Sequence, residues 1–90
     1  MKALISKKAE ISIEEIYEYI AKDNNLSAQK IVNKIHKAVE TISQNPYIGV
    51  AGRYDGTREF FVPRTKYYVV YEIEVGFINI ANIMHTARDY

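Results

Sequence analysis

The hydrophobic pattern of this chain changes at Asn45-Pro46, and that change limits the folds the chain can adopt. Before it, apolar residues recur every three or four positions, which is the period of an amphipathic helix. After it, Gly49, Gly52 and Gly56 mark a loop, and β-branched and aromatic residues then dominate, as they do in strands. A chain in which helices precede strands is expected to fold as an α+β protein.

A short apolar run at residues 3–5 predicts a first strand, and a helix is expected to follow it. This helix has two candidate starts. Ser12 with Glu15 forms a capping box, in which both side chains bind free backbone N–H groups, and Ser6 is the alternative cap. The polar segment at residues 22–25 interrupts the pattern, so the helix is expected to end there.

A second helix is predicted from Ser27, whose hydroxyl can cap it, to the residues before Pro46. The connection between the two helices is short, so they are expected to pack as an antiparallel hairpin. The apolar residues of the second helix form one stripe: Ala28, Ile31, Val32, Ile35, Ala38, Val39 and Ile42.

Three strands are predicted in the second half, at residues 57–62, 67–73 and 77–84. Their short connections predict antiparallel neighbours. Together with the first strand they would form a mainly antiparallel sheet of three to four strands, with the helical hairpin packed on one face. A chain of 90 residues is too short for two cores, so residues 1–90 are expected to be a single domain.

Composition argues against several classes of protein. No stretch approaches the roughly 20 apolar residues that span a bilayer, and no signal peptide is recognised, so a cytoplasmic location is expected. Cysteine is absent and no metal or cofactor motif is found, so neither group is expected. The net charge of +1 counts against unaided nucleic-acid binding. Four cations can still form one local positive patch: Arg53, Arg58, Arg64 and Lys66.

An ordered set of short motifs crosses the second half of the chain. No single motif is specific, but the set and the order of elements resemble the ParE/RelE superfamily, the toxins of bacterial type II toxin–antitoxin pairs. The resemblance implies a toxin that a cognate antitoxin protein holds inactive. The motifs are Pro46-x-x-Gly49, Gly52-Arg53, Gly56-Thr57-Arg58-Glu59, Tyr68-Val69-Val70-Tyr71 and His85-x-x-Arg88-Asp89.

The family supports two activities, and a fold alone does not decide between them. ParE-like members are known for poisoning DNA gyrase, whereas RelE-like members cut messenger RNA, usually on the ribosome. RelE-like sites resemble one another in their cations on the strand after the loop and before the Val-Val-Tyr segment, where they stabilise phosphorane charge. Here the comparable positions hold Glu59, Phe61 and Tyr68. The resemblance is therefore nearer the ParE-like branch, with RNA cleavage as the alternative and the question of an enzyme left open.

Candidate site residues fall into two groups. For a nuclease, His85 would transfer protons while Arg58 and Arg88 stabilise phosphate charge. Each has a structural alternative, because a strand-end histidine can simply hydrogen-bond and an arginine can pair with a carboxylate. An acidic antitoxin segment is expected in the groove between hairpin and sheet and on the patch around Arg53 and Arg64. The group expected to contact target or antitoxin is Arg53, Arg64, Lys66 and Tyr90.

Overall fold

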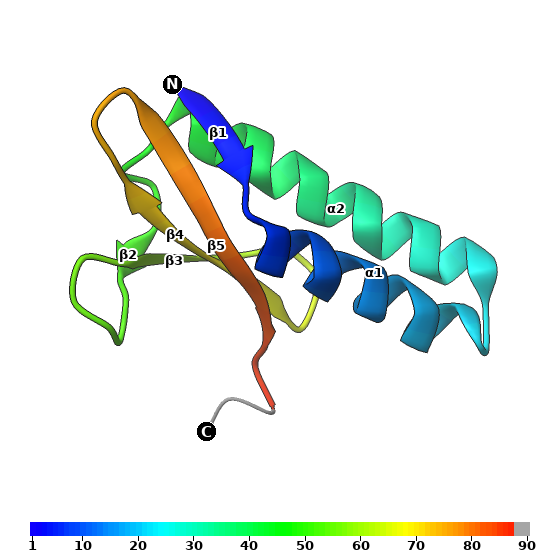
Figure 1. The fold of residues 1–90 in the computed structure, drawn as a ribbon. Coiled ribbons are helices and arrows are strands. Elements are labelled where there is room, and N and C mark those ends of the chain that lie inside the picture. Colours follow the sequence, from blue (N-terminus) through cyan, green and yellow to red (C-terminus); the bar gives the residue numbers. More distant parts are fainter. Residues whose placement is uncertain (88–90) are drawn as a thin grey trace.

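A computed structural model describes residues 1–87, which form two layers, with two helices on one face of a five-stranded sheet (Figure 1). The α+β architecture expected from the sequence is confirmed. The helices are α1 (Lys7–Ala21) and α2 (Asn25–Gln44). The strands are β1 (Lys2–Ile5), β2 (Val50–Ala51), β3 (Arg58–Phe61), β4 (Tyr67–Ile73) and β5 (Phe77–His85), in the spatial order β1-β5-β4-β3-β2.

The sheet is mixed, because β1 runs parallel to β5 while the other neighbours are antiparallel. The parallel pairing begins with Lys2 opposite Phe77 and ends with Ile5 opposite Ile80. Within residues 1–87 the sheet has five strands, one more than the upper end of the expected three to four. The additional strand is β2, which pairs with β3 inside the predicted loop and is too short to produce an alternating pattern.

The first helix begins at the earlier of its two candidate caps. The hydroxyl of Ser6 accepts a hydrogen bond from the N–H of Ala9 at 3.1 Å and donates to the carbonyl oxygen of Ala81 at 3.0 Å. Ser6 therefore caps α1 and also joins it to β5. Ser12 lies inside the helix instead, where its hydroxyl donates to Oδ1 of Asn82 at 2.6 Å.

The second helix begins before the predicted cap. Oδ1 of Asn24 accepts a hydrogen bond from the N–H of Ser27 at 3.0 Å, so Asn24 is the N-cap and α2 starts at Asn25. The prediction of Ser27 as the cap was wrong, because asparagine caps a helix as well as serine does and stands three residues earlier. The predicted end before Pro46 is confirmed.

Side chains alternate between the two faces of the sheet, so only one set of strand residues meets the helices. On β4 the residues toward the helices include Val69 and Tyr71, which join α1 and α2 in one hydrophobic core. Tyr68 is 1% exposed but lies outside that core, because it points to the other face. We call that side the helix-free face. Cross-strand partners share a face. The register therefore places these residues on it: Val50, Glu59, Phe61, Tyr68, Val70 and Met84.

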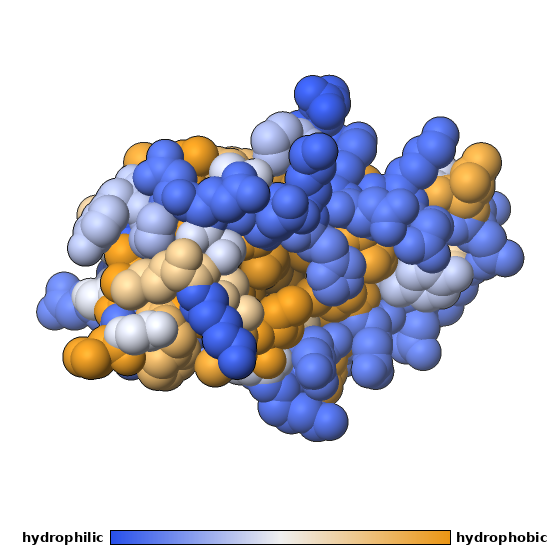
Figure 2. Space-filling view, turned by 90° about the horizontal axis from the view of Figure 1, so that it is seen from above, coloured by the Kyte–Doolittle hydropathy of each residue, from blue (hydrophilic) through white to orange (hydrophobic). Residues whose placement is uncertain are grey.

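Hydrophobic and hydrophilic residues are unevenly distributed over the surface. Seen from above, hydrophobic residues gather over the sheet half of the molecule, whereas hydrophilic residues cover most of the helical half (Figure 2). Among residues 1–87, neither helix combines the length and the apolar character needed to cross a membrane.

Candidate functional site

The loop between α2 and β3 is fastened to the sheet by residues of the sequence motifs. The hydroxyl of Tyr71 donates to the carbonyl oxygen of Pro46 at 2.7 Å and accepts from the N–H of Gly49 at 2.9 Å. Nη2 of Arg58 donates to the carbonyl oxygens of Gly49 at 2.6 Å and Tyr47 at 3.2 Å. These motif residues therefore hold the path of the loop by satisfying its backbone groups.

Arg58 has its guanidinium group turned toward this loop. The guanidinium carbon lies 5.3 Å from the centre of the Tyr47 ring, within the range of a cation–π interaction. Its Nε is buried and has no hydrogen-bond partner within residues 1–87. The sequence left a choice between a phosphate or protein contact and a carboxylate pair. Within residues 1–87, the hydrogen-bond partners of Arg58 Nη2 are loop carbonyl oxygens, and a role in phosphate binding stays a prediction.

Close approach explains two glycines of the motifs. A Cβ atom on Gly49 would lie 2.7 Å from the Tyr71 hydroxyl oxygen and 2.9 Å from the carbonyl oxygen of Glu59. A Cβ atom on Gly52 would collide with the hydroxyl oxygen of Thr57. A side chain at either position would therefore force the loop away from the strands.

A second cluster surrounds Glu59 on the helix-free face. This buried carboxylate accepts a hydrogen bond from the N–H of Arg53 at 3.1 Å, and its Oε2 lies 3.4 Å from Nε of Arg53. The guanidinium carbon of Arg53 is 5.6 Å from the centre of the Tyr68 ring, which stacks on Phe61 with centroids 5.1 Å apart. The positions where RelE-like sites carry cations thus hold one paired carboxylate and two stacked rings.

Arg64 and Lys66 lie on the turn between β3 and β4. Both side chains are exposed, and neither forms an ion pair within residues 1–87. The backbone of Arg64 has φ of 59°, in the left-handed region. The carbonyl oxygen of Lys66 accepts from the N–H of Thr86 at 2.8 Å, which ties the turn to the end of β5. The structure therefore gathers these two cations on one turn and places Arg53 on the loop before β3.

His85 is the last residue of β5 and lies opposite Tyr67 on β4. Its Nδ1 accepts from the N–H of Ala87 at 3.0 Å, and its ring meets the Tyr67 ring edge-on with centroids 5.0 Å apart. Arg58 lies opposite Tyr71, four residues farther along β4, or roughly 13 Å at strand spacing. The structure therefore does not bring His85 and Arg58 together.

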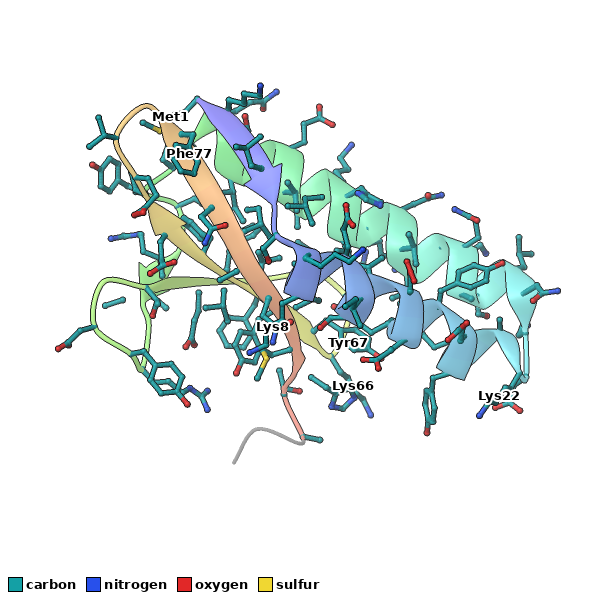
Figure 3. All side chains as sticks on the ribbon, viewed as in Figure 1. Met1, Lys8, Lys22, Lys66, Tyr67 and Phe77 are labelled. Atoms are coloured by element: carbon teal, nitrogen blue, oxygen red, sulfur yellow. The ribbon has the colours of Figure 1, made fainter. Side chains whose placement is uncertain are left out.

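A groove of about 610 Å³ lies between α1 and the ends of β4 and β5. The sheet contributes Tyr67, Met84 and His85 to its lining, and α1 contributes Ile16 together with charged residues described below. Tyr67 points into the space between β5 and α1, and Lys22 marks the far end of the helix (Figure 3). The groove lies between the hairpin and the sheet, in the region where an antitoxin segment is expected from the sequence.

Two other candidates, Arg88 and Tyr90, lie outside the described residues. Within residues 1–87, no group of three or more His, Cys, Asp or Glu side chains is placed to hold a metal ion. Two features were not predicted from the sequence: the hydrogen bonds from the Tyr71 hydroxyl to the loop, and the pairing of Glu59 with Arg53. The sequence signal that could have pointed to these residues is their position, because Tyr71 and Glu59 are each the last residue of one of the motifs.

The two-layer fold, with its loop bonded to the sheet by motif residues, defines a small α+β domain of the ParE/RelE type. Residues 3–90 match the family model described as ParE toxin of type II toxin-antitoxin system, parDE. The chain belongs to this family. It is a type II toxin of the ParDE kind, and membership implies a cognate antitoxin as a partner.

One sequence relative agrees with this assignment, and two solved structures share the fold. The chain is 31% identical over 78 residues to a Sinorhizobium fredii protein named "Putative toxin Y4kP", covering 87% of this chain and 80% of that protein. Its fold is similar to a chain of the chromosomal ParDE TA system from P. aeruginosa, with a TM-score of 0.85 and 22% sequence identity. The match covers 94% of this chain and 95% of that chain. It is also similar to the YoeB dimer structure from Staphylococcus aureus, with a TM-score of 0.60, 18% identity and the same coverage.

Proposed function

We propose that this toxin stops growth by binding a protein target, DNA gyrase, and that it does not cut RNA. The observation that carries the proposal is the chemistry of the helix-free face at Glu59, Phe61 and Tyr68. Cleavage through the 2′-hydroxyl builds negative charge on the phosphorane, which cations must stabilise. A carboxylate and two uncharged rings do not supply that charge, and the nearby Arg53 is already paired with Glu59.

The separation of His85 from Arg58 supports the same conclusion. A general acid or base must lie within hydrogen-bond reach of the proton that it moves, while cations lie around the same phosphate. His85 lines the groove beside α1, roughly 13 Å along the sheet from the register position of Arg58. These two residues would not act on one phosphate without a rearrangement.

The helix-free face has the composition of a protein-binding surface. Aromatic residues, methionine and arginine are enriched at interfaces between proteins. Phe61 is 49% exposed and Val50 61% exposed on this face, next to the buried ring of Tyr68. Covering exposed apolar side chains of a sheet with a partner stabilises the complex, because it removes apolar surface from water.

We further propose that the cognate antitoxin binds at the groove beside α1 and at the cations around Arg53 and Arg64. Its contacts would compete with those of the target wherever the two surfaces overlap. The family relationship supports an antitoxin as such, and the groove and exposed cations support this location.

The direct test adds the purified toxin to a DNA gyrase supercoiling reaction and, separately, to ribosomes translating a defined messenger RNA. We expect loss of supercoiling at a toxin concentration that leaves the messenger RNA intact. Prior incubation with the antitoxin should restore supercoiling. Cleaved messenger RNA together with normal supercoiling would favour the RelE-like alternative.

A further inference from the structure

We infer that the antitoxin contributes one extended segment with a fixed order of charges: basic residues beside α1, apolar residues at the end of β5, and acidic residues beside the β3–β4 turn. The inference rests on the proposed antitoxin site. It concerns the path and the chemistry of the segment that fills this site.

Met84 joins the groove to the helix-free face. It lines the groove and is also the cross-strand partner of Tyr68, whose ring stacks on Phe61. The strand on the outer side of β5 ends at Ile5, opposite Ile80, so within residues 1–87 no strand continues beyond that point. An occupant of the groove can therefore pass around the end of β5 onto the helix-free face.

The outer edge at the end of β5 is capped by side chains. The N–H of Ile83 donates to Oδ1 of Asn82 at 2.9 Å, and the same oxygen accepts from the hydroxyl of Ser12 at 2.6 Å. An extended segment can replace such side-chain bonds with main-chain bonds, as when a peptide adds to the edge of a sheet. This edge is therefore suited to an extended segment.

The α1 wall of the groove carries a net negative charge. Glu15 and Glu18 line it, and Lys22 is the single lysine among the lining residues. An acidic segment is expected here from the sequence, but such a segment would meet the carboxylates of Glu15 and Glu18. Charge complementarity instead favours basic residues in the part of the partner that lies against α1.

The turn between β3 and β4, just before Tyr67, carries the opposite charge to the α1 wall. Arg64 and Lys66 are exposed there and form no ion pair within residues 1–87, whereas Arg53 is compensated by Glu59. Acidic residues of the partner are therefore favoured at this end. A segment that becomes ordered on binding can follow a groove and then a sheet edge, which a rigid folded surface does less readily.

The first half of the test reverses the groove charge. The variant Glu15→Lys/Glu18→Lys is compared with Glu10→Lys/Glu14→Lys, which makes the same change on exposed positions of α1 outside the groove lining. Calorimetry measures the Kd of each purified toxin for the protein encoded by the small reading frame beside the toxin gene. We expect Kd to rise about ten-fold or more in the groove variant and less than about two-fold in its control.

The second half reverses the charge of the turn. The variant Arg64→Glu/Lys66→Glu is compared with Lys30→Glu/Lys37→Glu on the exposed side of α2. The same rise of about ten-fold is expected for the turn and not for its control. Thermal transitions confirm folding, and a variant that does not fold is replaced by the single change Glu18→Gln or Lys66→Gln.

Partner substitutions then test the order of charges. Reversing basic residues of the partner should restore binding to the groove variant and not to the turn variant. An unchanged Kd in the groove variant or in the turn variant overturns the inference. The inference is also overturned if reversing basic residues of the partner restores binding to the turn variant and not to the groove variant. If the unaltered toxin inhibits gyrase and binds the neighbouring protein in that case, the proposed function stands. Absence of any binding by the unaltered toxin would overturn the proposed antitoxin site as well.

Discussion

Tyr71 on β4 and Gly49 in the loop after α2 are joined by a buried hydrogen bond, in which the N–H of Gly49 donates to the Tyr71 hydroxyl at 2.9 Å. The same hydroxyl donates to the carbonyl oxygen of Pro46 at 2.7 Å. One side chain thus satisfies two backbone groups of the loop. This side chain therefore physically connects the motif at residues 46–49 to the motif that ends in Tyr71.

Replacing Tyr71 by phenylalanine should therefore destabilise the toxin. The change keeps the ring but leaves the N–H of Gly49 without its partner, which costs about 1–3 kcal/mol for a buried group. Urea unfolding measures the free energy of unfolding of each variant. The matched control is Tyr54→Phe at a position that is 70% exposed, where a change within about 0.5 kcal/mol is expected. Equal effects of the two substitutions would show that the bond to the loop contributes little.

The start of α2 gives a second prediction. Asn24→Ala removes the cap of the helix and should cost about 1 kcal/mol. Ser27→Ala should cost less, because its backbone N–H, rather than its hydroxyl, takes part in the cap. Thermal unfolding of the two variants under identical conditions makes the comparison. A larger loss for Ser27→Ala would contradict the observed cap.

His85→Gln tests the role of proton transfer in toxicity. Glutamine keeps hydrogen bonding and approximate volume, so a toxin that acts by binding should still arrest growth. A histidine that served as general acid or base would instead contribute about 10²- to 10⁴-fold in rate, and its loss would abolish arrest at low expression. His36→Gln on the exposed side of α2 is the control and should be silent. If a folded His85→Gln protein loses toxicity while His36→Gln keeps it, the result would indicate ribonuclease activity.

The fold class could be predicted because both helices and the longer strands carry their own patterns. The apolar stripe of α2 is visible in the sequence, and its buried residues include Ile35 and Ile42. The start of α1 could not be decided locally, because Ser6 and Ser12 both offer a hydroxyl. The choice depends on Ala81 and Asn82 of β5, which lie far along the chain. Similarly, β2 exists only through its pairing with β3.

The candidate site was less accessible to sequence reasoning. The unusual residue Glu59 could be recognised by its place in a motif, but its pairing with Arg53 depends on how the loop returns to the sheet. Arg58 was chosen for its charge, and its contacts with loop carbonyl oxygens depend on the backbone path from α2. Local patterns encode which elements form, whereas such contacts require the assembled fold.

The central claim is that arrest follows from binding gyrase and not from cutting RNA. It is tested most directly by measuring plasmid supercoiling and messenger RNA integrity in the same cells after the toxin is expressed without an antitoxin. We expect supercoiling to be disturbed while transcripts stay intact. Rapid cleavage of transcripts with unaltered supercoiling would contradict it.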